Sequence, residues 1–285
     1  MKVMLARSLS VAVLVLAGSV SFAGACATKT LDAGHDNPPD TGTPTGLLDN
    51  LVGYWRLDDG AGSVTAFDSS GRGNEGMLHG LDTASAWVTG RSQGALAIAH
   101  NGWVQVAASA SIDAISDRLT VSAWVNWEGT IDAWATALSR QIGTGVDQYY
   151  HLSLGMDGHP TFLVTADGFA TPHATQLAEM GVWTHIAGTY DGATARMYVN
   201  GVEVDSAPLT GAFPADTTPV ILGGNGNDAS GVATELFPGR IDELMLYARA
   251  LSAAEIGQLA AGALFPAGAR DAGARDAGAR DAGAD

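Results

Sequence analysis

The stretch GRIDELMLYARALSAAEIGQL, residues 239–259, joins a hydrophobic strand to a short capped helix. The strand carries an acidic pair, Asp242 and Glu243. Ser252 has the side chain of a helix N-cap, and Glu255, three residues later, completes a capping box. The sequence therefore predicts a strand, then a turn, then a helix over residues 252–260.

The chain before this stretch shows strand signals and almost no helix signal. Residues 119–127, LTVSAWVNW, alternate between two faces, as a strand with one buried side does. Asn200-Gly201 lies between two apolar runs, which is the strongest short-range signal for a β-hairpin. Residues 51–262 are long enough for one large domain. Many short strands with glycine-rich turns predict an all-β fold, a sandwich of two antiparallel sheets.

The order of these motifs resembles a laminin-G-type domain of the concanavalin A-like lectin/glucanase superfamily. The resemblance implies a jelly-roll sandwich with one short C-terminal helix, frequent calcium binding, and recognition of glycans or proteins. The segments that carry it are VGYW (52–55), DSSGRGN (68–74) with Gly76, 119–127, WTHIA (183–187) with YDG (190–192), 198–201 and 239–251.

One loop has the residue types of a calcium site. Calcium takes six to eight oxygen ligands, mostly carboxylates and carbonyls. Asp68 and Asn74 offer side-chain oxygens, and Gly71 lets backbone carbonyls turn inward. The resemblance places this loop beside the last strand, so we expect Asp242 to complete a structural calcium site. The alternative is a plain turn in which Asp68 bonds backbone amides, with Asp242 and Glu243 as exposed strand residues.

The sequence lacks the usual signatures of an enzyme. The glucanase branch of the superfamily carries Glu-x-Asp-x-Glu on one strand, and this triplet is absent. The glutamates, Glu128 and Glu235 among them, are scattered, and neighbours such as Asp242 and Glu243 point to opposite faces of a regular strand. The chain also has no HExxH or GxSxG motif. We predict a non-catalytic protein; the alternative is a glycan-active hydrolase or lyase with an unrecognised site.

Three residues outside the main strand motifs are candidates for ligand contact. Trp134 lies between two expected strands, Tyr149 follows a turn, and Asn225 begins an Asn-Gly-Asn-Asp loop. Loops on a rigid sandwich commonly carry binding residues, although a Trp is more often packed in the interior. We expect these residues to form the rim of a carbohydrate-binding, lectin-like site. The alternative is a structural or adhesion protein that binds a cell-surface protein.

The N-terminal region predicts export. Residues 1–25 combine basic residues, a short apolar run and small residues, as secretory signal peptides do. Cys26 follows directly and is the only cysteine. It predicts lipidation of an outer-membrane or cell-surface lipoprotein; the alternative is free secretion with an unpaired thiol. Residues 26–50 are rich in Gly, Pro, Asp and Thr and predict a flexible tether.

The C-terminal end and the overall charge limit the remaining possibilities. Residues 263–285 include a repeated Arg-Asp-Ala-Gly-Ala unit, which predicts a solvated low-complexity tail. Lys and Arg total 14 against 30 Asp and Glu, a net charge of −16. This balance argues against binding to nucleic acid and against adhesion to an anionic membrane by charge, so any membrane contact would come from a lipid anchor.

Overall fold

The computed structural model describes residues 46–98, 102–129, 131, 133–141, 148–227 and 232–264. The predicted signal peptide, Cys26, residues 26–45 of the tether and residues 265–285 of the tail lie outside the described residues. Within the described ranges, no helix is both long enough and apolar enough to cross a membrane.

Among the described residues, eight strands form the first sheet, sheet A. Its order is β14-β13-β12-β7-β18-β5-β4, and β1 pairs with β18 outside this path. The strands are β1 (Leu51–Trp55), β4 (Trp87–Ser92), β5 (Gly94–Ile98), β7 (Leu119–Trp127), β12 (Thr184–Tyr190), β13 (Thr194–Val199), β14 (Val202–Pro208) and β18 (Gly239–Tyr247).

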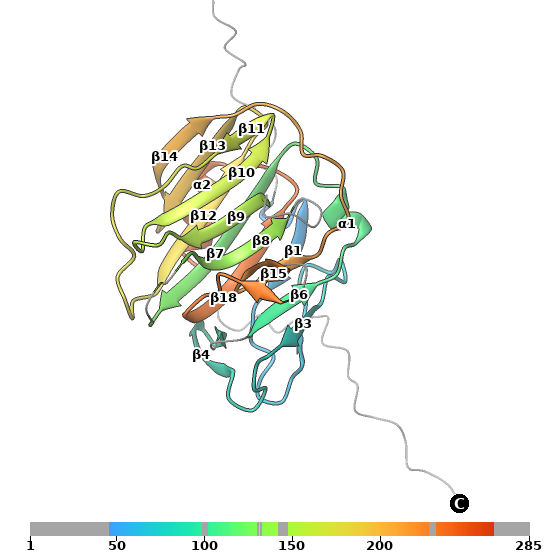
Figure 1. The fold of residues 1–285 in the computed structure, drawn as a ribbon, viewed down its shortest axis with the longest axis vertical. Helices are drawn as coiled ribbons and strands as arrows, with labels where there is room; N and C mark the ends of the chain where they lie inside the picture. Colours follow the sequence, from blue (N-terminus) through green and yellow to red (C-terminus); the bar gives the residue numbers. More distant parts are fainter. Residues whose placement is uncertain are drawn as a thin grey trace, which may run out of the picture. The chain divides into compact units, whose positions relative to one another are not determined.

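Sheet B also has eight strands in the described part of the chain, in the order β11-β10-β9-β8-β15-β6-β3-β2. Figure 1 follows this sheet from β11 at the top of the view down to β3. Its strands are β2 (Thr65–Ala66), β3 (Gly76–His79), β6 (Trp103–Val106), β8 (Ala135–Gln141), β9 (Gln148–Leu154), β10 (Pro160–Ala166), β11 (Gly168–Ala170) and β15 (Val220–Leu222). A separate small pair consists of β16 (Asn225–Asn227) and β17 (Ala233–Thr234).

The main core lies between the two sheets. Val121 and Val125 of β7 face it from sheet A and are fully buried, as the alternation in residues 119–127 predicts. Phe162 of β10 faces it from sheet B and lies against Gly188 of β12 so closely that a Cβ at Gly188 would collide with the ring. The strand pairings among the described residues are all antiparallel, so the predicted two-sheet sandwich is confirmed.

Two helices accompany the sheets in the described part of the chain. Helix α1 (Ala110–Asp113) is a single turn, and α2 (Ala253–Ala260) is the C-terminal helix that the sequence predicts. The capping box of α2 is present, with Ser252 accepting from the Glu255 N–H and the Glu255 carboxylate accepting from the Ser252 N–H. Ile256 and Leu259 of α2 pack on the outer face of sheet A, against Tyr198 and other apolar residues.

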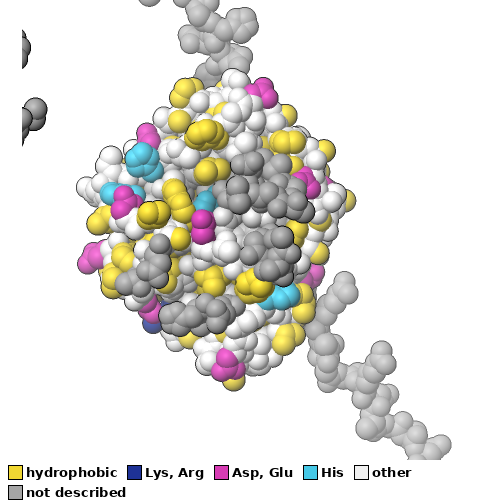
Figure 2. All heavy atoms as spheres, viewed as in Figure 1, with side chains coloured by type: hydrophobic (Ala, Val, Ile, Leu, Met, Phe, Trp, Pro, Cys, Tyr) yellow, Lys and Arg dark blue, Asp and Glu magenta, His cyan; other side chains and the backbone are white. Residues whose placement is uncertain are grey.

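The surface has few basic groups. Figure 2 shows acidic side chains spread over one face, very little Lys or Arg, and apolar side chains in small separate groups. This distribution agrees with the net charge of −16.

Candidate functional site: a groove at one end of the sandwich

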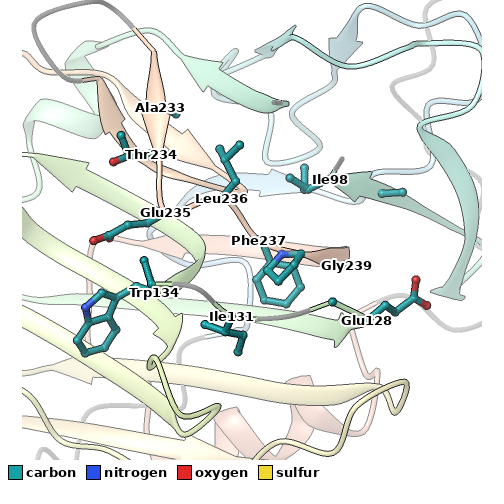
Figure 3. A pocket seen from close by; sticks show the side chains of 14 residues that line it. Ile98, Glu128, Ile131, Trp134, Ala233, Thr234, Glu235, Leu236, Phe237 and Gly239 are labelled. Atoms are coloured by element: carbon teal, nitrogen blue, oxygen red, sulfur yellow. The ribbon is translucent and has the colours of Figure 1, made fainter. Parts of the chain in front are cut away.

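A groove of about 550 Å³ opens where β5 and β7 end and β18 begins. We call it the Trp134 groove, and Figure 3 shows it from close by. Its lining comes from the ends of strands and from the turns beside them, because β18 pairs with both β5 and β7 at this point. The lining residues are Ala97, Ile98, Glu128, Gly129, Ile131, Ala133, Trp134, Ala233, Thr234, Glu235, Leu236, Phe237, Pro238 and Gly239.

Trp134 is the large aromatic side chain of the groove. It immediately precedes β8 and is half-buried. Its ring lies 5.8 Å from the ring of buried His151, and His151 Nε2 shares a hydrogen bond of 2.7 Å with Thr136 Oγ1. Burial lowers the pKa of His151 to about 3, so this histidine is a neutral packing partner that holds the indole in place.

Glu235 lies beside Trp134 in the groove (Figure 3). Asn225 Nδ2 donates a hydrogen bond of 2.7 Å to Glu235 Oε2, and burial raises the pKa of the Glu235 carboxyl although this hydrogen bond lowers it. Glu235 also has a left-handed backbone, with φ of 47°. Such a conformation costs a non-glycine residue about 1 kcal/mol or more and is often found at functional sites.

Glu128 lies at the other end of the groove from Glu235 (Figure 3). Its Oε1 forms an ion pair of 2.6 Å with Arg240, and both side chains are substantially exposed. The backbone N–H groups of Glu128 and Gly129 donate to the carbonyl oxygen of Pro238, at 2.8 and 3.2 Å, and so fix this loop against the turn before β18. Two glutamates that are far apart in the sequence therefore line one groove.

The structure brings two of the three predicted ligand residues to this place. Trp134 lines the groove, whereas Asn225 is buried outside the lining, where it pairs with Thr234 and donates a hydrogen bond to Glu235. Tyr149 is buried in β9 and lines a separate hollow of about 90 Å³. There the guanidinium of Arg140 lies 5.7 Å from the centre of the Tyr149 ring. Tyr149 therefore does not join the groove that Trp134 lines.

The predicted calcium loop forms a dense hydrogen-bonded network. Asp68 Oδ1 accepts from the backbone N–H groups of Tyr54 and Ser70, both at 2.9 Å. Asp68 Oδ2 accepts from Ser70 Oγ at 2.7 Å and from the Asn74 N–H at 2.9 Å. Asn74 Oδ1 accepts from Ser109 Oγ at 2.6 Å, while Gly71 supplies the left-handed turn with φ of 78°. We call these contacts the Asp68 network; they join β1, at Tyr54, to the loop.

Asp242 lies in a different set of contacts. It is fully buried, and its Oδ2 accepts from the Ser92 N–H at 2.9 Å, while Oδ1 has no hydrogen-bond partner among the described residues. A β-bulge at Glu243, with φ of 50°, interrupts the pairing of β18 with β7. The bulge directs Glu243 to the hydroxyl of Tyr54, which donates to it. The expectation that Asp242 and Glu243 are exposed or behave as residues of a regular strand is therefore wrong.

A calcium site built from Asp68, Asn74 and Asp242 stays a prediction. The side-chain oxygens of Asp68 and Asn74 already accept hydrogen bonds, and no described hydrogen bond or ion pair joins Asp242 to either residue. Within the described ranges, no three His, Cys, Asp or Glu side chains form a group that could hold a metal ion. The donor set seen at this loop is thus that of a hydrogen-bonded turn.

The calcium prediction is tested by melting. A bound ion stabilises only the folded state, so added calcium should raise the melting temperature of the full chain. Asp242→Ala should remove that rise if Asp242 is a ligand. If calcium leaves the melting temperature of the parent chain unchanged, the predicted calcium site does not exist.

Buried Asp242 predicts a pH dependence of stability. Burial raises its pKa to about 8, with Glu243 and Asp58 adding to the effect and the Ser92 N–H opposing it. In the unfolded chain this carboxyl has its ordinary pKa of about 4. The contribution of the Asp242 proton to the free energy of unfolding is therefore complete below about pH 4 and is lost as the pH rises toward the folded-state pKa of about 8. Between pH 6.5 and 8 the titration of Asp242 lowers the free energy of unfolding by up to about 1.4 kcal/mol per pH unit. The amide of Asp242→Asn does not titrate, so the free energy of unfolding of this variant, measured with chelator present, should fall less steeply by up to that amount.

The matched control is Asp157→Asn, since the Asp157 side chain is 69% exposed. We expect it to leave the pH profile of chemical denaturation unchanged. If Asp242→Asn and the parent chain had parallel profiles over this range, the assignment of the proton to Asp242 would be wrong.

The fold and the groove can now be compared with known proteins. A family model described as the concanavalin A-like lectin/glucanases superfamily matches residues 98–257, which is more than half of the chain. The chain belongs to this superfamily. The resemblance and the fold that its motifs imply are thereby confirmed. No match was found among curated protein sequences.

Solved structures show the same architecture at low identity. Domain 4 of AbnA, an extracellular arabinanase from Geobacillus stearothermophilus in complex with arabinotriose, matches with 24% identity and a TM-score of 0.57, covering 74% of this chain and 98% of that domain. The binding domain of Paraclostridial Mosquitocidal Protein 1 matches with 20% identity and a TM-score of 0.55, covering 75% of this chain and 52% of the other.

A third structure is the Trypanosoma rangeli sialidase in complex with sialic acid. It matches with 18% identity and a TM-score of 0.55, covering 74% of this chain and 32% of the sialidase. The chain thus corresponds to about one third of that enzyme. At these identities the likeness concerns the fold alone.

Proposed function

We propose that this domain is a carbohydrate-binding module and that its glycan lies in the Trp134 groove. The observation that carries the proposal is the placement of a half-buried indole beside the Glu235 carboxylate in one groove. An aromatic face packs against the apolar face of a sugar ring, and a carboxylate accepts hydrogen bonds from sugar hydroxyls. Ile131 and Phe237 extend the apolar lining between Trp134 and Glu128 (Figure 3).

The groove has the construction expected of a binding site. It is concave and mostly apolar, and its few polar groups are held by neighbours: Asn225 holds Glu235, and Arg240 holds Glu128. The Trp134 ring is also supported from behind by neutral His151. Such preorganisation lowers the entropy cost of binding. The arabinotriose complex of the AbnA domain, of which 98% matches this chain, adds support from analogy.

Export is part of the same proposal. A glycan-binding module meets its ligands outside the cell, and residues 1–25 have the pattern of a signal peptide. Cys26 is the proposed point of lipid attachment. Cys26→Ser should move the chain from the membrane fraction to the soluble fraction, whereas an unchanged distribution would favour free secretion.

The test of the proposed function is a glycan-array screen with the full chain. We expect binding to a defined set of oligosaccharides, and Trp134→Ala should abolish or strongly reduce it. Binding that is absent across the array, or that is as strong in Trp134→Ala as in the parent chain, would contradict the assignment.

A second function is favoured by one observation, the presence of two glutamates in one groove. Glycoside hydrolysis needs two carboxyl groups that flank the scissile bond. Glu235, whose pKa is raised by burial, has the property of a proton donor, and Glu128 lies at the other end of the groove. Our proposal expects no release of reducing sugar from any polysaccharide that binds. If the parent chain hydrolyses a polysaccharide and Glu235→Gln does not, the protein is a hydrolase and the proposal of a non-catalytic binding module is wrong.

A further inference from the structure

Among the described residues, the ionisable side chains that line the Trp134 groove are acidic. Glu128 and Glu235 are the titratable residues of its described lining, which contains no Lys, Arg or His. Arg240 is the basic residue that the described contacts place beside a lining residue. Its guanidinium is already paired with Glu128 Oε1 at 2.6 Å. An anionic group of a ligand would therefore find no unpaired positive partner among these residues.

Glu235 is built to accept hydrogen bonds from a ligand. Asn225 Nδ2 occupies Oε2 at 2.7 Å, and no described residue donates to Oε1. A sugar hydroxyl can donate to such an oxygen, whereas an ionised carboxylate or sulfate on the ligand can only accept. The same atom that binds a neutral sugar thus repels an acidic one.

The overall charge of the chain acts in the same direction. The chain carries a net charge of −16, and Figure 2 shows a face with acidic side chains and very little Lys or Arg. Near a protein surface, where the effective dielectric constant is about 20, repulsion between two like charges a few Å apart exceeds the thermal energy several-fold. This repulsion disfavours every anionic glycan, whatever its backbone.

We infer that the Trp134 groove selects neutral glycans and rejects glycans that carry uronate, sialate or sulfate groups in the bound segment. The inference rests on the proposed function and adds its substrate class. It also assigns a specificity role to the Glu128–Arg240 pair. In Glu128→Gln the guanidinium of Arg240 loses its partner at the groove, so this variant should gain affinity for uronates more than Glu235→Gln does.

The experiment compares neutral oligosaccharides with counterparts oxidised at C6. The probes are β-1,4-mannohexaose against β-1,4-mannuronate hexamer and cellohexaose against β-1,4-glucuronate hexamer, within an array that also carries arabinan, sialylated and sulfated glycans. Binding is measured for the full chain at about 0.05 M and about 0.5 M salt, because salt screens the proposed repulsion. The variants are Glu128→Gln, Glu235→Gln and the matched control Glu75→Gln, an exposed carboxylate outside the groove.

The expected result is that the array's hits are neutral glycans, bound at least about tenfold more tightly than anionic ones at low salt. The preference should narrow at high salt and in Glu128→Gln, and Glu75→Gln should retain it. Equal or tighter binding of anionic glycans by the parent chain would overturn the inference and leave the binding module in place. A preference that none of the groove variants changes would also overturn it. Absence of binding to any glycan would instead overturn the proposed function, and with it this inference.

Discussion

Asp68→Ala is expected to lower the free energy of unfolding by about 2–4 kcal/mol. The Asp68 carboxylate accepts four hydrogen bonds, from the N–H groups of Tyr54, Ser70 and Asn74 and from Ser70 Oγ. Alanine leaves these donors without their acceptor, and an unsatisfied buried donor costs about 1–3 kcal/mol. The loss also loosens Asn74, whose carbonyl accepts from the indole N–H of fully buried Trp55 at 2.8 Å.

Denaturant unfolding of two matched variants isolates this effect. Asp82→Ala removes an exposed carboxylate that accepts from the Ala84 N–H and from Ser85 Oγ, where water can replace it. We expect that control to lower the free energy of unfolding far less than Asp68→Ala does. Asp68→Asn keeps one acceptor oxygen, so its loss of unfolding free energy should lie between those of Asp68→Ala and Asp82→Ala. Equal losses in Asp68→Ala and Asp82→Ala would show that the Asp68 network does not stabilise the fold.

Trp134→Ala is expected to weaken glycan binding by about 1–3 kcal/mol, which is roughly a 5- to 150-fold rise in Kd. The indole supplies the large aromatic surface of the groove, and the methyl group of alanine cannot replace it. Because Trp134 is half-buried at the end of the sandwich, the melting temperature should change little. Calorimetric titration with the best ligand from the array measures the affinity, and thermal melting measures the stability.

The matched control is Trp183→Ala, since Trp183 is also half-buried but does not line the groove. It should leave the Kd unchanged. A large fall in the melting temperature of Trp134→Ala, with unchanged affinity, would show that this indole is a packing residue.

Local sequence signals were sufficient for the fold. Asn200 and Gly201 have φ of 49° and 84°, as the hairpin between β13 and β14 requires. The capping box of Ser252 and Glu255 is formed as predicted. These signals act over a few residues, so they can be recognised without knowledge of the tertiary structure.

The groove could be predicted only in part. Trp134 was found because it lies outside the strand patterns, whereas Glu128 and Glu235 looked like scattered acids. They come together because Gly239 of β18 pairs with Trp127 of β7, and such long-range pairing leaves no local signal. Asn225 was expected in a loop at the rim, but it lies buried in β16 outside the groove lining, and its contact with Glu235 accompanies the pairing of β16 with β17.

The acidic pair in β18 shows a second limit of pattern reading. Alternation assigns Asp242 and Glu243 to opposite faces only when the strand is regular. The strand is irregular because of the bulge at Glu243, where the backbone is left-handed. Glutamate rarely adopts this conformation, so the sequence gives no signal of the bulge. Asp242 is nevertheless fully buried, and burial raises its pKa although the Ser92 N–H, which donates to its Oδ2, opposes that rise.

The most direct test of the central claim, that a glycan lies in the Trp134 groove, is to follow the tryptophan indole N–H signals by NMR during titration with the best array ligand. The chain has seven tryptophans, and variants assign their signals. We predict that the Trp134 signal shifts with saturation at the Kd, while the signals of Trp55 and Trp127, whose indole N–H groups are bonded to backbone carbonyls, stay unchanged. A ligand that binds without moving the Trp134 signal, or that moves another indole instead, would contradict the account.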